Sequence, residues 1–120
     1  MPDHANVELV RRGYEAFDKG DMQTVDALFA DDIVWHNGSR GPLAGTLTSK
    51  KEVFEFFGKL AELSGGTFHI EVHDVVGGDD HVVVLSTGHA TRNGQTLASQ
   101  GSDIMHVRDG KVEKDEKIPK

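Results

Sequence analysis

Two residues far apart in the sequence have side chains that could form an acid–base pair, His36 and Asp103. An imidazole titrates near neutral pH and can act as a base. A carboxyl group in an apolar concavity is disfavoured in its charged form, so Asp103 could act as an acid. Enolisation of a ketone and aldol-type ring closure need this combination, because the acid stabilises the enolate oxygen. The alternatives are that His36 is hydrogen-bonded to the loop after it and that Asp103 is solvated.

A second set of polar residues, His69, Glu71 and His73, is spaced by two, which places three metal-capable side chains on one face of a strand. Apolar residues alternate with them and would occupy the core, so the polar row is predicted to face solvent or a partner. Three ligands from one strand are hard to bring around one ion. No metal and no cofactor is therefore predicted, with a metal site as the minor alternative. If the turn at residues 77–80 holds an even number of loop residues, the same row would instead lie on the face that carries Val84 and Asp103 and would line the cavity.

The first half of the chain is predicted to be mainly helical. Apolar residues at steps of three and four predict a helix over residues 6–17 and a shorter one from Asp21 to the Asp31–Asp32 pair. Residues 33–36 are β-branched or aromatic and predict a short strand, followed by a glycine-rich loop over residues 37–47. A third helix starts at the capping residue Ser49 and ends before Gly65.

The second half is predicted to be entirely β. Four strands are expected, at Thr67–Val76, His81–Thr91, Gln95–Val107 and Lys111–Ile118, and the charged tail Glu113–Lys120 is expected to be a solvated edge or a frayed end. This order predicts an α+β fold in which three N-terminal helices pack in the concave face of a strongly curved antiparallel or mixed sheet, a cone-shaped α+β barrel. Residues 1–120 would form one domain.

The Asn93–Gly94 pair predicts a two-residue hairpin turn, and this fixes which side chains share a face. One face then carries Val82, Val84, Ser86, Gly88, Ser99, Gly101, Asp103 and Met105. The small residues among them leave room for a ligand, and the aromatic residues of the helices and first strand could form its wall. The predicted ligand-binding residues are Tyr14, Phe17, Trp35, Asn37, Phe57, Val84, Ser86, Ser99, Gly101 and Met105. The alternative is that this face is reversed.

Composition excludes several classes of protein. The chain has 120 residues, 37% of them hydrophobic, and a formal net charge of −7, which argues against a nucleic-acid partner. There is no cysteine, hence no disulfide and no thiolate site. The longest apolar run, Val82 to Leu85, is too short to cross a bilayer, and no membrane partner is predicted. The start of the chain has no basic-then-apolar signal, so a cytoplasmic location is expected.

Short fragments along the chain follow the order found in one known family. They are Glu8–Arg12, Tyr14–Phe17, Gly20–Asp21, Ala27–Asp32, Val34–His36, Pro42–Gly45, Gly65–Phe68 and Val107–Val112. Together they resemble the SnoaL-like branch of the nuclear transport factor 2-like superfamily, which includes ketosteroid isomerases and polyketide cyclases. The resemblance implies the cone-shaped fold and, usually, a homodimer formed through the outer face of the sheet. It does not imply a particular reaction.

The catalytic residues of characterised relatives are only partly present. The resemblance places the isomerase base at Asn37 or, with a shift of one, at His36, the isomerase tyrosine at Gly13 beside Tyr14, and its acid at Asp103. One match in three argues against steroid isomerisation. The Arg-x-Asp motif of the epoxide hydrolases is absent from residues 84–89. The last strand reads Lys-Asp-Glu at 114–116, where the family commonly has a tryptophan.

These observations predict a protein with a hydrophobic pocket that binds a small apolar or cyclic molecule. Its chemistry would be acid–base isomerisation or cyclisation of a ketone or polyketide-like substrate by His36 and Asp103, with Tyr14, Trp35 and Asn37 orienting the substrate. The alternative is a non-catalytic carrier, or a dimeric interaction module built on the same fold.

Overall fold

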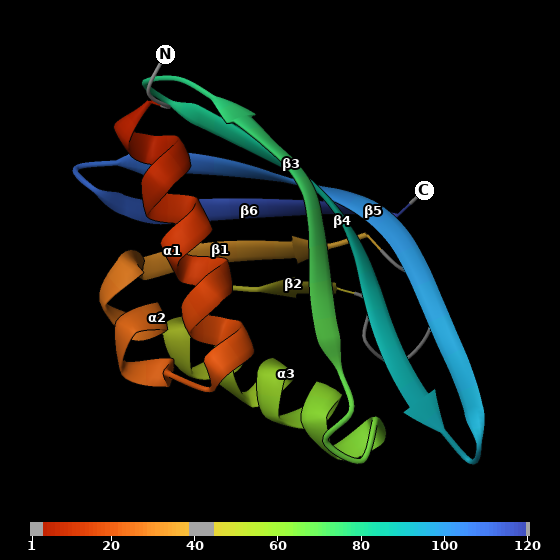
Figure 1. The fold of residues 1–120 in the computed structure, drawn as a ribbon. Coiled ribbons are helices and arrows are strands. Elements are labelled where there is room, and N and C mark those ends of the chain that lie inside the picture. Colours follow the sequence, from red (N-terminus) through yellow and green to blue (C-terminus); the bar gives the residue numbers. More distant parts are fainter. Residues whose placement is uncertain (1–3, 39–44, 120) are drawn as a thin grey trace.

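The computed structural model describes residues 4–38 and 45–119, and three helices lie on one side of a bent sheet (Figure 1). The elements are α1 (Ala5–Lys19), α2 (Met22–Leu28), β1 (Phe29–Asn37), β2 (Gly45–Leu47), α3 (Lys50–Leu63), β3 (His69–Gly77), β4 (His81–Arg92), β5 (Gln95–Arg108) and β6 (Lys111–Pro119). The predicted α+β class and the packing of the helices against the curved sheet are confirmed. The sheet is open and is not closed into a barrel.

The strand order is β2-β1-β6-β5-β4-β3, and β1 and β6 are parallel while the other neighbours are antiparallel. This corrects the expectation for the charged tail, because β6 is a central strand between β1 and β5. Asp115 and Lys117 pair with Met105 and Asp103 and lie on the side of the sheet turned toward the helices, whereas Lys114 and Glu116 lie on the opposite side. A strand with polar side chains on both faces is indistinguishable from an exposed strand by composition alone.

Two boundaries in the first half differ from those predicted. Helix α2 ends at Leu28, and Phe29 adopts an extended backbone and opens β1. Its ring packs at 6.1 Å from those of both Trp35 and Phe54, measured between ring centroids, and this contact is available only from the strand. The predicted loop of residues 37–47 contains residues 39–44, which lie outside the described residues; Asn37 ends β1, and Gly45 begins β2.

The predicted β4–β5 hairpin is confirmed, including its register. Arg92 pairs with Gln95 and Val84 pairs with Asp103, and both turn residues have positive φ, 53° at Asn93 and 78° at Gly94. Glycine and asparagine adopt this left-handed conformation most readily. The face of the sheet that carries Val84 and Asp103 is turned toward the helices and is called the cavity face below; the opposite one is the outer face.

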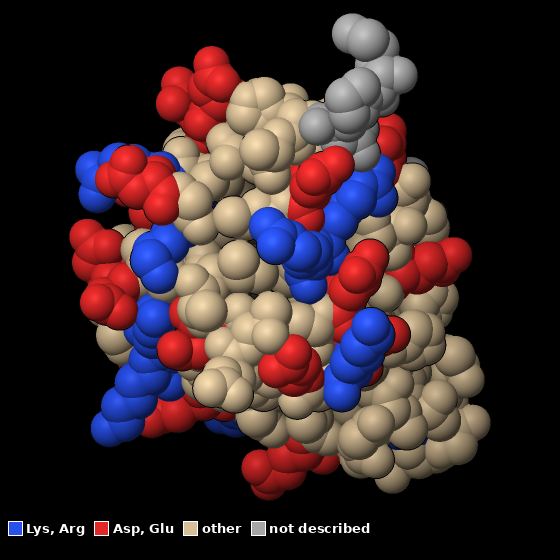
Figure 2. All heavy atoms as spheres, turned by 60° about the vertical axis from the view of Figure 1, so that its left-hand side comes forward, with Lys and Arg blue, Asp and Glu red and all other residues tan. Residues whose placement is uncertain are grey.

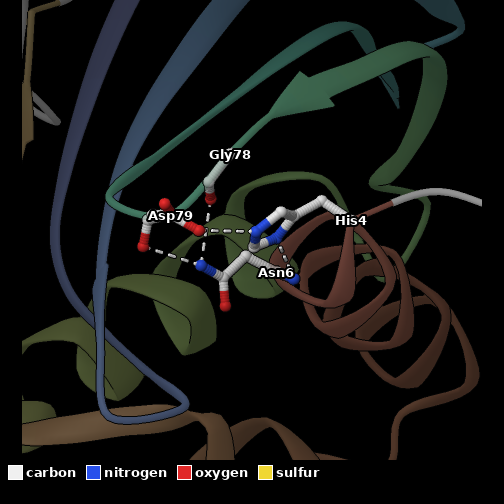
Figure 3. Close-up of polar contacts among 4 residues, drawn as sticks. All are labelled: His4, Asn6, Gly78 and Asp79. Atoms are coloured by element: carbon white, nitrogen blue, oxygen red, sulfur yellow. Dashed lines mark hydrogen bonds and ion pairs between the residues drawn. The ribbon is translucent and has the colours of Figure 1, made fainter.

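Helix α1 is anchored at its start to the β3–β4 turn (Figure 3). His4 Nδ1 accepts a hydrogen bond from the Asn6 backbone N–H at 3.1 Å, and its Nε2 lies 2.8 Å from Asp79 Oδ1. The Asn6 side-chain amide donates to the carbonyl oxygens of Gly78 and Asp79, at 3.0 and 2.9 Å. Because Nδ1 is the acceptor, the ring hydrogen is on Nε2 and is donated to Asp79. These contacts fix the position of α1 relative to the sheet.

The helical side of the molecule carries charges of both signs. On the face seen in Figure 2, acidic and basic side chains are interspersed, so the net negative charge is not gathered in a single patch there. Within residues 4–38 and 45–119, no helix is both long enough and apolar enough to cross a membrane.

Candidate functional site

A cavity of about 300 Å³ lies between the helices and the cavity face of the sheet. This is the lower end of the usual range for small-molecule sites, a size that suits a ligand of one or two rings. Its described lining residues are Leu9, Val10, Gly13, Tyr14, Phe17, Val25, Leu28, Phe29, Trp35, Asn37, Phe56, Phe57, Leu60, Phe68, Ile70, Ser86, Gly88, Ser99, Gln100, Gly101, Asp103, Met105, Val112, Lys117 and Ile118. Most are apolar.

Aromatic rings form one wall of the cavity. Phe57 of α3 lies 5.1 Å from Phe17 of α1 and 5.6 Å from Trp35 of β1, measured between ring centroids, and both pairs are edge-to-face. Edge-to-face packing holds these rings in fixed orientations. The aromatic residues of α1, β1 and α3 therefore present a rigid apolar surface to a molecule in the cavity.

The opposite wall contains the cavity's charged groups. Asp103 is 2% exposed, and its Oδ2 accepts a hydrogen bond from the Tyr14 hydroxyl at 3.1 Å. The same oxygen lies 3.4 Å from Lys117 Nζ. Among the described lining residues, Asp103 and Lys117 are the only charged ones. Asn37 adds an amide beside them, because it pairs with Lys117 across β1 and β6.

A second buried carboxyl, Asp115, lies against Asp103 and is fully buried. Burial raises its pKa well above the usual range, and the charge of Asp103 raises the pKa further. Neither oxygen of Asp115 has a hydrogen-bond partner among the described side chains and backbone groups, so nothing there stabilises a charged form. Burial beside Asp103 therefore favours the neutral form of Asp115.

Tyr14 remains a neutral hydrogen-bond donor over a wide pH range. Burial, followed by the nearby charges of Asp103 and Asp115, raises the pKa of its hydroxyl well above the usual value. Asp103 thus accepts a hydrogen bond from Tyr14, lies beside Asp115 and is paired with Lys117. One negative charge is balanced by one positive charge in an otherwise apolar cavity.

Most of the predicted ligand-binding residues line the cavity. Those that do are Tyr14, Phe17, Trp35, Asn37, Phe57, Ser86, Ser99, Gly101 and Met105, together with Asp103. Val84 is on the cavity face but is fully buried in the core and does not reach the cavity. The sequence-based prediction missed Lys117 and the buried Asp115, because β6 was expected to be exposed, and several apolar lining residues, among them Phe56 and Phe68.

The expected pairing of His36 with Asp103 is corrected by the structure. Trp35 and Asn37 face the cavity, so strand alternation turns His36 to the outer face. There its Nδ1 lies 2.8 Å from the Thr46 hydroxyl oxygen of β2, and its strand partner on β6 is Glu116. The two proposed catalytic groups are on opposite sides of the sheet, and His36 has no path to a molecule in the cavity.

The row of His69, Glu71 and His73 also lies on the outer face. His69 stacks on His89 with ring centroids 4.8 Å apart, and His89 Nε2 lies 3.0 Å from Glu71 Oε1. A β-bulge between Val72 and Asp74 separates His73 from them, and its Nε2 lies 2.6 Å from the Thr87 hydroxyl oxygen. Within the described parts of the chain, no three His, Asp or Glu side chains converge as metal ligands.

A bent, open sheet over an apolar cavity and three helices is the fold of solved structures described as NTF2-like. The profile of the SnoaL-like domain matches residues 10–114, and the chain belongs to this family. The chain is similar to Bal32a from a soil-derived mobile gene cassette, with 32% identity, a TM-score of 0.90, and coverage of 95% of this chain and 88% of that one.

Two further relatives extend the comparison. An NTF2-like protein of unknown function from Burkholderia pseudomallei has 24% identity and a TM-score of 0.84, and the match covers 96% of this chain and 90% of that one. At this level of identity the similarity is evidence for a shared fold only. The uncharacterized protein Rv0034 of Mycobacterium tuberculosis is 28% identical over 113 residues, which are 93% of this chain and 86% of that protein.

Gly13 offers a direct test of the packing at the cavity wall. A Cβ atom at this position would lie 3.4 Å from Leu28 Cδ1, an ordinary van der Waals contact. Gly13→Ala is expected to raise the free energy of unfolding by about 0.5–1 kcal/mol, because alanine favours the interior of a helix. Urea denaturation measures the change, and a decrease would show that Leu28 cannot accept the added methyl group.

Proposed function

We propose that the protein binds a small apolar or cyclic ketone in the cavity and isomerises or cyclises it by acid–base chemistry at Asp103. The observation that carries this proposal is the placement of one charged pair, Asp103 and Lys117, at one wall of an otherwise apolar cavity. Apolar pockets with a few convergent polar groups are typical of small-molecule sites. The substrate would place its rings against Phe17, Trp35 and Phe57 and its oxygen toward the charged wall.

The chemistry uses Asp103 as a base and two neighbouring polar groups, Asn37 and Lys117, as stabilisers of the developing negative charge. Its carboxylate accepts a proton from the carbon next to the carbonyl group, and the electron pair of that C–H bond moves toward the carbonyl oxygen. The Asn37 amide and the Lys117 ammonium lie on the same wall and stabilise the negative oxygen. Returning the proton to a different carbon isomerises the ketone. Attack of the enolate carbon on a second carbonyl instead closes a ring, and the alkoxide that forms takes the proton held by Asp103.

Two measurements on the purified protein test this proposal. Trp35 is the only tryptophan and lines the cavity, so binding of 2-tetralone or cyclohexanone is expected to change its fluorescence. Catalysis is expected to exchange the α-hydrogens of the bound ketone for deuterium in heavy water, followed by NMR. Binding without exchange would support the non-catalytic carrier, and the absence of both would refute the proposal.

The outer face of the sheet supports a second copy of this chain as the protein partner. It exposes Val76 at 51% and Leu85 at 46%, large apolar side chains that a partner would cover. Six of the seven histidines also lie on it, His36, His69, His73, His81, His89 and His106. A two-fold dimer brings the same surface together from both copies, so a charge added to this surface meets its own copy across the interface.

A charge placed on this face is therefore expected to prevent dimerisation. The carboxylate of Leu85→Asp would be buried against the partner's apolar side chains without a positively charged partner, once in each copy. Light scattering is expected to show a dimer for the wild type and a monomer for Leu85→Asp. A dimer that survives Leu85→Asp would place the interface elsewhere.

A further inference from the structure

The acid–base mechanism uses Lys117 only as a positive charge, although its amine can also act as a nucleophile. It is the only primary amine among the described residues that line the cavity. Its register places it between Asn37 of β1 and Asp103 of β5, and its side chain is 36% exposed. The amine is thus at the charged wall, beside the expected position of the ketone oxygen and within reach of the carbonyl carbon.

The contact between Lys117 and Asp103 is loose. Their 3.4 Å separation is longer than the 2.7–2.9 Å typical of a charge-assisted hydrogen bond. Asp103 also accepts a hydrogen bond from the Tyr14 hydroxyl, so it does not depend on Lys117 alone for its hydrogen bonds. The carboxylate is therefore placed to accept a proton from the ammonium group, which leaves the neutral amine that attack on a carbonyl carbon requires.

We propose that Lys117 forms a covalent iminium with the carbonyl carbon of the bound ketone. This inference rests on the proposed ketone binding and changes how the ketone is activated. The neutral amine nitrogen attacks the carbonyl carbon, and the carbonyl oxygen takes up a proton to give a carbinolamine. The proton on that oxygen comes from the attacking nitrogen, so the carbinolamine is neutral and Asp103 still holds its proton. The hydroxyl group of the carbinolamine then takes the proton held by Asp103 and leaves as water. Overall, one ammonium and one ketone give one iminium and one water, with no oxidation or reduction.

The iminium makes the proton transfer at Asp103 easier. When the α-carbon loses its proton, the electron pair of the C–H bond moves into the positively charged C=N bond and gives a neutral enamine. Asp103, again a carboxylate after water has left, accepts that proton. Lys117 and Asp103 then act on the same molecule in sequence, the first as nucleophile and the second as base.

Reductive trapping tests this assignment. The protein is incubated with 2-tetralone and sodium cyanoborohydride, which reduces an iminium to a stable secondary amine, and the modified peptide is located by mass spectrometry. The adduct is expected on Lys117. Lys117→Arg keeps the positive charge beside Asp103 but has no nucleophilic amine, so it is expected to lose both the adduct and most of the deuterium exchange. Lys114→Met, on the outer face of the same strand, is the matched control and is expected to retain both.

The outcomes separate this inference from the proposed function. An adduct on Lys117 that is lost in Lys117→Arg supports the iminium. Normal binding and exchange with no adduct, or exchange retained in Lys117→Arg, would overturn the iminium while leaving the acid–base proposal intact. An adduct spread over surface lysines also overturns it. If 2-tetralone neither binds nor exchanges, both proposals fail.

Discussion

Replacing Asp103 by asparagine is expected to slow α-deuterium exchange of a bound ketone by at least about 100-fold, the usual contribution of a positioned general base. Asparagine has nearly the same shape, and its carbonyl oxygen can still accept the hydrogen bond that the Tyr14 hydroxyl donates at 3.1 Å to Asp103. An amide nitrogen has no basic lone pair near neutral pH, so proton transfer is lost while the cavity remains. NMR measures the exchange, and Trp35 fluorescence measures whether the ketone still binds.

The control for this experiment is His36→Ala. His36 lies on the outer face and contacts Thr46, so its removal is expected to leave exchange unchanged. Exchange that persists in Asp103→Asn and disappears in His36→Ala would reverse the roles argued here. A loss of binding as well as exchange in Asp103→Asn would show that the carboxylate holds the ligand instead of moving its proton.

Asp115→Asn is expected to make the protein progressively more stable than the wild type as the pH rises. Burial and the neighbouring Asp103 raise the pKa of Asp115 in the folded state. The folded wild-type protein therefore holds a proton that the unfolded chain releases at lower pH. The stability from this proton is fully present below the ordinary aspartate pKa and is lost as the pH rises through the folded pKa. Asparagine does not titrate, and its amide can donate to Asp103 at every pH.

Urea denaturation at several pH values between 4 and 9 measures this difference. The difference in free energy of unfolding between variant and wild type is expected to grow with pH, with a limiting slope of about 1.4 kcal/mol per pH unit for one proton. Asp18→Asn, at an exposed carboxylate of α1, is the matched control and is expected to give a flat difference. A flat profile for Asp115→Asn would mean that Asp115 does not hold the extra proton.

The part of the site that depends on local signals was predictable from the sequence. The Asn93–Gly94 turn sets the register of β4 and β5, and so it places Asp103, Ser86 and Gly101 on one face. The spacing of apolar residues places Tyr14 and Phe17 on the buried side of α1. Turn geometry and helical periodicity both act over a few residues, so they are legible without knowledge of the rest of the fold.

The part contributed by β6 was not predictable in this way. A two-residue turn at Asp109–Gly110 would place Glu116 opposite Asp103. A β-bulge between His106 and Val107 shifts the pairing by one residue and puts Lys117 there instead. A shift of one exchanges the two faces of a strand, and nothing in the local sequence marks this bulge.

Which face of β1 lines the cavity was not predictable for a related reason. His36 and Asn37 are adjacent, and which of them faces the cavity depends on how β1 pairs with β6. That pairing joins Trp35 to Asp115. It is set by contacts between distant parts of the chain, and the β-branched and aromatic residues of the strand are compatible with either phase.

The parallel pairing of β1 with β6 also has a consequence for how the protein folds. Contacts between segments so distant in the chain carry a large loop-closure cost and tend to slow folding. Because Trp35 and Asn37 come from one of these strands and Lys117 from the other, the cavity wall exists only after this late association. A partly folded chain, even one with its hairpin and helices formed, lacks a complete site, so recovery of ligand binding during refolding reports arrival at the native state.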